Sequence, residues 1–515
     1  MRVKLAALVL LATPVLAQQP APPAFRVEET TIAQVHDAMR ANRLTCGALV
    51  DAYLRRIDAY DKNGPAINAI VQINPDARKE ADELDRRFAQ GGVVGPLHCV
   101  PVIVKDNFET IGLQSAAGSL SLKGFVSRKD AFLVKRMKEA GAIVLAKSNM
   151  AEFAFSPYET VNSILPGYTR NPYALDRVTA GSSGGTAAAV AANFGLVGLG
   201  SDTGNSIRGP SSHQALVGIR STMGLTSRAG VIPLSLLADI AGPMTRTVED
   251  AVAVFQAIAG EDPDDPATAA SHGRAIPDYR QSLQRDGLKG ARIGILRQAY
   301  ERDTTDPEIV DVFMAAIQDL TRAGATIVDP VRVDLSDVRR AQGAGSCGGF
   351  KYDINRYLAA QGDRVTVHSL EEIIRSRGFH PSIEARLRSA QDGPENGPDT
   401  PACKADADYR EAFRAAVTKT MDAHKLDAFV YPTWSNPPRL IGDLNTPHGD
   451  NSQVFSPTTG WPAINVPMGY TRGTLPVGMT IFGRAWSEPT LVKFAYAYEQ
   501  ATRHRRPPAS APPLR

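Results

Sequence analysis

Short apolar runs alternate with helical patterns along this chain, and this alternation restricts the folds that it can adopt. Residues 99–108, 142–147 and 196–202 are apolar runs of the length typical of buried strands. Between them, residues 75–92 and 130–140 carry apolar side chains at helical spacing. Strands without a polar face need cover on both sides. The sequence therefore predicts an α/β fold whose sheet is covered by helices on both faces.

The rest of the chain continues this pattern with two exceptions. Helices are expected within 31–60, 244–260, 306–323 and 489–508, and late strands within 426–433, 463–470 and 475–483. Residues 341–410 are polar and are expected to be irregular, and residues 508–515 are expected to form a disordered tail. Because no repeat and no clear linker interrupts the chain, residues 30–507 are expected to form a single domain.

The first 29 residues are expected to lie outside this domain. A basic start at Arg2 and Lys4, an apolar run to Leu16 and a small residue at Ala17 predict a signal peptide over residues 1–17. Residues 18–29 are Pro-rich and are expected to form a tether. The apolar run is too short for a spanning helix, so we expect export to the periplasm or the exterior and no stable membrane insertion.

Composition excludes some partners. The chain has 515 residues, with 57 basic and 54 acidic side chains and a net charge of +3. This balance gives no reason to expect nucleic acid as a partner. We expect a small-molecule substrate, no cofactor, and a monomer or homodimer.

Four cysteines would meet an oxidising compartment if the chain is exported. They are Cys46, Cys99, Cys347 and Cys403, and none shows C-x-x-C spacing, so no metal site is expected. Pairing in order closes the two shortest separate loops and predicts disulfides Cys46–Cys99 and Cys347–Cys403. A free Cys99 could be a second nucleophile, but we expect it to be oxidised.

The glycine-rich segment "GSSGG", residues 181–185, allows two interpretations from its own residues. It is either a glycine-rich turn or the G-x-S-x-G elbow of an esterase with Ser183 as nucleophile. The elbow needs a strand directly before the serine, and Pro172 and Arg177 make residues 170–180 a poor strand. It also needs a histidine, and the candidates His424 and His448 lie in polar surroundings. These points disfavour the elbow.

A third interpretation places the nucleophile further along, in "GSDTGNSIRGPSS". Ser206 follows a strand and a turn, so the main-chain N–H groups before it can form an oxyanion hole. Lys105 ends the strand "PVIV", where loss of water would favour its neutral form. A neutral lysine is a competent base for a serine. Lys147 also ends an apolar strand, and we interpret it as an ordinary strand-end charge.

These segments together resemble the amidase signature family, which includes fatty acid amide hydrolase, peptide amidases and the A-type chain of amidotransferases. The similarity is carried by residues 181–212, by "GPLHCVPVIVKDNFET", by "VLAKSNMAEFAF" and by the late strands from 460. It extends from about residue 30 to 507 and is weakest at 340–410. It implies the amidase signature fold, an α/β fold with a large mixed β-sheet covered by helices on both faces.

The resemblance also implies roles for residues. Ser206 would be the nucleophile, Ser182 a bridging serine after a cis peptide bond, and Lys105 the base. The oxyanion donors would be the main-chain N–H groups of Thr203, Gly204, Asn205 and Ser206. Supporting positions would be Ser183, Asp202 and Arg208. The family often has glycine where this chain has Asn205, a residue that tolerates the left-handed region.

The expected function is an exported amidase that forms an acyl-enzyme and releases a carboxylic acid with ammonia or an amine. An esterase or carbamate hydrolase with the same three residues is the alternative. An amidotransferase subunit fits less well, because a signal peptide would separate it from a cytosolic substrate. A non-catalytic binding protein would not need Lys105, Ser182 and Ser206 together. The substrate pocket is expected within 150–160, 230–240 and 340–460.

Overall fold

A computed structural model describes residues 25–338, 347–395 and 397–514 of the chain. Its main sheet has eleven strands: β1 (Ile70–Ile73), β2 (Pro101–Lys105), β3 (Ile143–Ser148), β6 (Val197–Asp202), β7 (Val217–Arg220), β8 (Ile240–Thr245), β9 (Arg292–Leu296), β10 (Thr326–Val331), β11 (Ala428–Pro432), β12 (Ala463–Thr471) and β13 (Leu475–Phe482). They are ordered β1-β3-β2-β6-β8-β7-β12-β13-β11-β9-β10. Neighbours are parallel from β3 through β2 to β6 and from β11 through β9 to β10, and antiparallel elsewhere. The predicted mixed sheet is confirmed.

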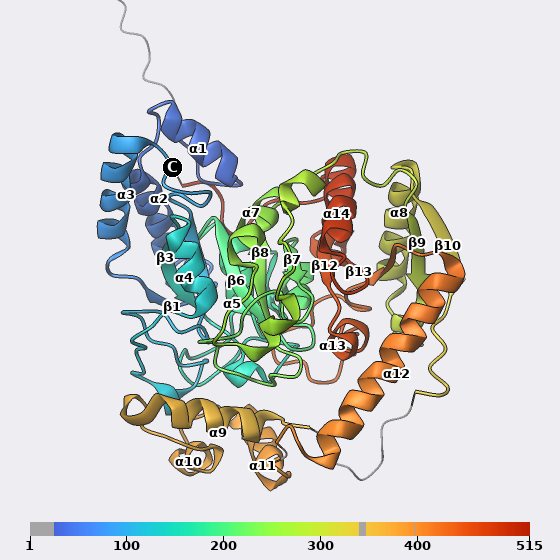
Figure 1. The fold of residues 1–515 in the computed structure, drawn as a ribbon. Helices are drawn as coiled ribbons and strands as arrows, with labels where there is room; N and C mark the ends of the chain where they lie inside the picture. The colour runs from blue at the N-terminus through green and yellow to red at the C-terminus, as the bar shows by residue number, and fades with distance from the viewer. Residues whose placement is uncertain (1–24, 339–346, 396, 515) are drawn as a thin grey trace, which may run out of the picture.

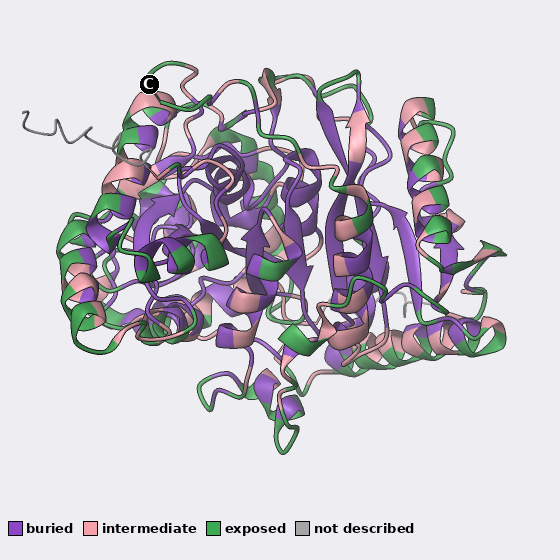
Figure 2. Ribbon diagram, turned by 90° about the horizontal axis from the view of Figure 1, so that it is seen from above, coloured by how far each residue is buried: buried purple, intermediate pink, exposed green. Residues whose placement is uncertain are grey.

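Helices flank the sheet on both faces (Figure 1). Those nearest to it are α4 (Phe132–Glu139), α5 (Gly184–Ala191), α6 (Arg208–His213), α7 (Val248–Ile258), α8 (Pro307–Arg322) and α14 (Glu488–Thr502). The N-terminal helices α1 (Ile32–Arg40), α2 (Cys46–Ile57) and α3 (Ala77–Gly91) lie at the β1 end. Figure 2 shows buried strands inside helices that are exposed on their outer sides. None of the helices in the described ranges has both the length and the apolar character that a membrane crossing requires.

Three central strands are buried along their whole length, as their apolar sequences predict. Every residue of β2, β3 and β6 is buried, including the charged residues Lys105, Lys147 and Asp202. Each of these three lies near the carboxyl end of its strand. Since the strands are parallel neighbours, those ends meet at one edge of the sheet. This edge brings polar groups together inside the protein.

Residues 170–178 form more regular structure than the sequence indicated. Strands β4 (Arg170–Asn171) and β5 (Ala174–Val178) pair as a small separate antiparallel sheet. Pro172 falls in the turn between them, where it interrupts no ladder hydrogen bond. A strand therefore does precede Ser182, but it is not part of the main sheet.

The prediction of an irregular segment at 341–410 is wrong for its described residues. They form α9 (Phe350–Gln361), α10 (Leu370–Ser376), α11 (Glu384–Asp392) and the start of the long helix α12 (Pro401–His424), which lie below the sheet in Figure 1. Each helix turns a few apolar side chains inward, such as Ile354, Leu358 and Leu387, to a second hydrophobic cluster that includes Phe155. Short helices with narrow apolar faces resemble polar loops in sequence, which explains the error.

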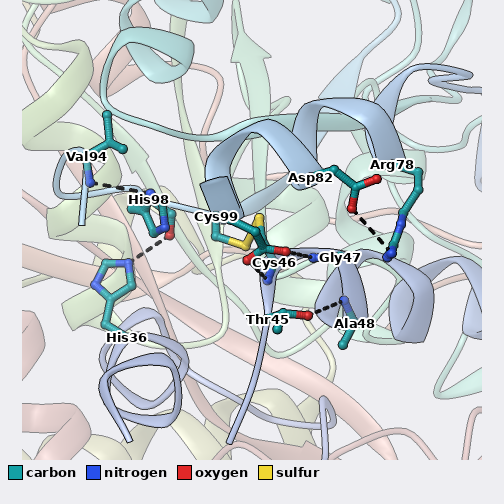
Figure 3. Close-up of a disulfide and its surroundings, with 11 residues drawn as sticks. His36, Thr45, Cys46, Gly47, Ala48, Arg78, Asp82, Val94, His98 and Cys99 are labelled. Carbon is teal, nitrogen blue, oxygen red and sulfur yellow. Dashed lines mark hydrogen bonds and ion pairs between the residues drawn. A yellow bond between two sulfur atoms is a disulfide. The ribbon is translucent and has the colours of Figure 1, made fainter. Parts of the chain in front are cut away.

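Two disulfides join the cysteines in the predicted order. Cys46 begins α2 and bonds to Cys99 just before β2, in a fully buried position (Figure 3). Cys347 precedes α9 and bonds to Cys403 in the first turn of α12. The second bond thus ties together the two ends of the segment that contains α9, α10 and α11.

Both ends of the domain are packed more closely than predicted. The signal peptide and residues 18–24 of the tether lie outside the described residues. The tether's remaining residues are part of the fold, because Val27 is buried and Glu29 forms an ion pair with Arg505. The C-terminal residues 508–514 are not a disordered tail. The buried guanidinium group of Arg56 donates to the carbonyl oxygens of Ala511 at 2.7 Å and Pro512 at 3.0 Å.

Removal of residues 508–515 should therefore destabilise the protein. Arg56 would lose two of its acceptors while it stays largely enclosed, and a hydrogen bond to a charged group contributes about 1.5–3 kcal/mol. We expect a lower melting temperature by calorimetry. A chain that lacks only residues 514 and 515 is the control, because Leu514 is exposed and both acceptors of Arg56 precede it in the chain. Equal melting temperatures for the two truncated chains would contradict this prediction.

Candidate active site

Lys105 is the central group of the buried polar cluster. Its Nζ atom lies 2.7 Å from Ser182 Oγ and 2.8 Å from Ser201 Oγ, and also contacts the Ser201 carbonyl oxygen at 3.3 Å. Asn107 donates to Ser201 Oγ at 3.1 Å. Ser201 and Asn107 were missed in the sequence, although each is a polar residue in or beside an otherwise apolar strand. The arrangement fixes the amine against the Ser182 hydroxyl.

Burial changes the charge state of this lysine. Its exclusion from water lowers the pKa of Lys105 to about 7, although the nearby carboxylates of Asp239 and Asp202 act in the opposite direction. No carboxylate lies within ion-pair distance of Nζ in the described part of the chain. A large fraction of Lys105 is therefore neutral near pH 7, as a proton acceptor must be.

Ser182 and Ser183 are placed by a close approach of several backbone segments. The Gly181–Ser182 peptide bond is cis, as the resemblance implies. A Cβ atom at Gly181 would lie 2.4 Å from the Ser156 carbonyl oxygen, so only glycine fits there. The Ser183 hydroxyl donates to the Ser201 carbonyl oxygen at 3.1 Å, and its N–H group donates to the Ser206 carbonyl oxygen at 3.3 Å. These bonds connect the glycine-rich segment to both ends of the next turn.

That turn, residues 203–206, is held by a buried ionic network. Asp202 accepts from Arg208 at 3.1 Å and from Arg220 at 3.1 Å, and all three side chains are inaccessible to solvent. It also accepts from the Ile207 N–H group at 3.1 Å. Burial alone would raise the pKa of Asp202, but the two guanidinium groups lower it to about 2. Arg220 was not singled out in the sequence, where its signal is a charge at the end of the apolar strand β7.

The four expected oxyanion donors lie on this turn, between β6 and α6. Within the described residues, the N–H groups of Thr203, Gly204, Asn205 and Ser206 donate to no protein acceptor. The Asn205 side chain is buried and packs toward Gly209, where an added Cβ would be 2.3 Å from Asn205 Nδ2. Asn205 is not among the residues with positive φ, so the left-handed conformation is not used.

A cavity of about 360 Å³ opens beside the turn. One part of its wall is apolar or aromatic: Ala154, Phe155, Pro157, Tyr158, Leu234, Ala238 and Pro457. The other part is polar: Thr203, Gly204, Ser206, Arg386, Arg410, Gln453 and Thr458. Ser206 thus reaches the cavity, whereas Asn205 is absent from its wall and does not narrow it. The three segments expected to line the pocket all do so.

The competing candidates lie elsewhere. Lys147 contacts the carbonyl oxygen of Phe108 at 2.5 Å and the Ser115 hydroxyl at 3.0 Å, away from the two serines. Burial lowers its pKa to about 8, against the effect of nearby carboxylates. His448 stacks on Tyr158 at 3.9 Å between ring centroids and does not contact Ser183. Because Ser183 donates to a carbonyl oxygen instead, the elbow interpretation has no support.

Comparison with known proteins agrees with this geometry. The family model described as Amidase matches residues 48–492. The chain belongs to the amidase family. A probable amidase of Arabidopsis thaliana is 35% identical over 94% of this chain and 92% of its own length. The A-type chain of glutamyl-tRNA(Gln) amidotransferase from Moorella thermoacetica is 34% identical over 93% and 98%. The solved structure of native peptide amidase from Stenotrophomonas maltophilia has a TM-score of 0.83 and 38% identity, over 93% of this chain and 98% of that chain.

The buried network makes a prediction about this amidase. Asp202→Asn would leave two buried guanidinium groups without their counter-charge, which typically costs about 3–5 kcal/mol. We expect a correspondingly lower free energy of unfolding in a denaturant titration. Glu384→Gln is the matched control, because the Glu384–Arg388 ion pair is exposed and should contribute less than about 1 kcal/mol. A loss no larger than that of the control would show that the network is not needed.

Proposed function

We propose that this amidase is exported and hydrolyses carboxamide C–N bonds through Lys105, Ser182 and Ser206. The observation that carries the proposal is the buried Lys105 amine, 2.7 Å from Ser182 Oγ, beside a cavity into which Ser206 projects. The two disulfides and the sequence of residues 1–17 support export.

Acylation follows from the order of these groups. Neutral Lys105 accepts the Ser182 proton while Ser182 accepts the Ser206 proton, and Ser206 Oγ forms a bond to the substrate carbonyl carbon. The carbonyl oxygen gains the negative charge and is stabilised by the free N–H groups of residues 203–206. When the intermediate collapses, the C–N bond breaks and the proton returns through Ser182 to the leaving nitrogen. Ammonia or an amine departs.

Deacylation repeats the path with water. A water molecule loses a proton toward the Ser182–Lys105 pair and attacks the ester carbonyl carbon. The proton then returns to Ser206 Oγ, the ester bond breaks, and the carboxylic acid leaves. Lys105 is neutral again at the end of the cycle, so the proposal needs no other base.

Peptide amides are the substrates that the comparisons favour. A solved structure with 39% identity and a TM-score of 0.83 is described as a peptide amidase in complex with the competitive inhibitor chymostatin. The aromatic and polar halves of the cavity would suit a peptide-like acyl group. An esterase or carbamate hydrolase with the same residues is the alternative, and relative turnover of matched amides, esters and carbamates separates them. The relatives among amidotransferase chains leave one further alternative, which activity of the purified single chain would exclude.

The nucleophile can be identified by covalent labelling. A fluorophosphonate probe should modify Ser206, because an activated serine that faces the cavity is accessible to it. Ser206→Ala should abolish labelling and turnover, as measured by mass spectrometry and amide hydrolysis. Modification mapped to Ser183 would contradict the proposal.

The two buried lysines provide a matched pair of variants. Lys105→Met keeps most of the side-chain volume but removes the amine, and should lower kcat by about 10²–10⁴-fold, the usual contribution of a general base. Lys147→Met makes the same change in a lysine that does not contact Ser182, and should cost far less activity per folded molecule. Circular dichroism verifies folding of both. Similar losses of kcat in the two variants would argue against Lys105 as the base.

The rate should depend on pH through Lys105. Its neutral form is the active one, so kcat/KM should rise with pH and level off above the pKa of about 7. An unshifted lysine would titrate near ~10.4 and place the plateau several units higher. A pH–rate profile of the wild type measures this. A rate that does not change between pH 5 and pH 9, on the scale set by that pKa, would contradict the role.

A further inference from the structure

Two arginines line the polar side of the cavity, and their surroundings differ. Arg410 forms an ion pair with Asp406 at 2.6 Å and donates to the Pro457 carbonyl oxygen at 3.0 Å. Its charge and several of its donors are therefore engaged within the protein. Arg386, on α11, donates to the Phe155 carbonyl oxygen, and no carboxylate lies within ion-pair distance of it in the described ranges. Arg386 keeps an uncompensated positive charge at the cavity wall.

A second cavity of about 530 Å³ adjoins the first, and Phe155 and Arg386 line both. Phe155 packs edge-on against Phe350, with ring centroids 4.6 Å apart, so the shared wall is rigid and apolar. Lys351 also lines the second cavity and donates to the Gln391 carbonyl oxygen at 2.9 Å. Like Arg386, it has no ion-pair partner among the described residues. The second cavity therefore combines apolar surface with two cationic groups.

Few acidic groups oppose this charge. Glu159 is the carboxyl group whose pKa responds to Arg386; burial raises that pKa, while Arg439 and Arg386 lower it. It forms no ion pair with Arg386. Glu384, on the same helix, is already paired with Arg388 at 2.6 Å. An incoming anion would therefore not have to displace an internal partner from Arg386.

We propose that Arg386 selects amide substrates that carry a carboxylate remote from the scissile bond. This inference rests on the proposed function: the acyl part would extend from Ser206 past Phe155 into the second cavity. A guanidinium group offers a planar pair of donors that matches a carboxylate, and Lys351 adds positive charge behind it. The carboxylate belongs to an acidic side chain of a peptide amide or to a dicarboxylic acyl group at its N-terminus.

Pairs of substrates that differ in charge test the proposal. The first pair is N-acetyl-glutamyl-phenylalanine amide and its glutaminyl counterpart, and a second version inserts alanine to move the acid one residue further away. N-succinyl- and N-butanoyl-phenylalanine amide test a terminal carboxylate. Product acids are quantified by mass spectrometry, so that hydrolysis of the glutamine side chain is counted separately. The measured quantity is the ratio of kcat/KM for the anionic substrate to that for the neutral one.

We expect a ratio of at least about threefold for one pair at low salt, falling toward one at high salt because Arg386 is exposed to screening. Arg386→Gln should bring the ratio close to one, whereas Arg386→Lys should retain part of it. Arg388→Gln is the matched control on the same helix, and it should keep the wild-type ratio because Arg388 lines neither cavity. Using a ratio removes any general loss of activity or folded protein.

The pair that shows the preference identifies the source of the carboxylate, and either result supports the proposal. A wild-type ratio of one for every pair, with Ser206-dependent turnover of the neutral amides, would overturn the role of Arg386 and leave the amidase proposal intact. An unchanged ratio in Arg386→Gln would also overturn it. If no amide is turned over in a Ser206-dependent manner, the proposed function fails and this inference fails with it.

Discussion

The ion pair between Asp202 and its two arginines is the interaction on which the site depends. One carboxylate at the end of β6 receives Arg208 from the following helix and Arg220 from another strand. The turn between these contacts has fixed ends, so its N–H groups stay directed away from the network. A preorganised set of donors needs no rearrangement when charge develops on a substrate. The cost of burying three charges is offset by their mutual contacts.

The sheet has a chemical as well as a mechanical effect. Because β2, β3 and β6 are enclosed on both faces, Lys105 cannot be hydrated, and its pKa falls to about 7. The same enclosure shifts the pKa of Lys147 to about 8, so burial alone does not distinguish the two lysines. Their neighbours do: Lys105 meets hydroxyl groups that can exchange protons, whereas Lys147 meets mostly carbonyl oxygens.

The sequence predicts the parts of this fold that have strong periodicity or specific motifs. The apolar strands, the capped helix after Thr247 and the positions of Lys105, Ser182 and Ser206 could be assigned from residues and resemblance. Helices α9 to α11 could not, because each buries only a few side chains against distant segments. Ser201 and Arg220 were missed since their partners lie on other strands. Such pairings depend on strand order, which the sequence does not state.

The contact between Arg56 and the C-terminal residues has a consequence for how the protein is made. Arg56 lies in the second helix of the domain, yet two of its hydrogen-bond acceptors belong to residues 511 and 512. The environment of an early side chain is thus completed by some of the last residues to leave the ribosome. A growing chain cannot close its N-terminal helices in their final form. For a protein that has to cross a membrane before it folds, this late closure would favour transport of the chain in an open state.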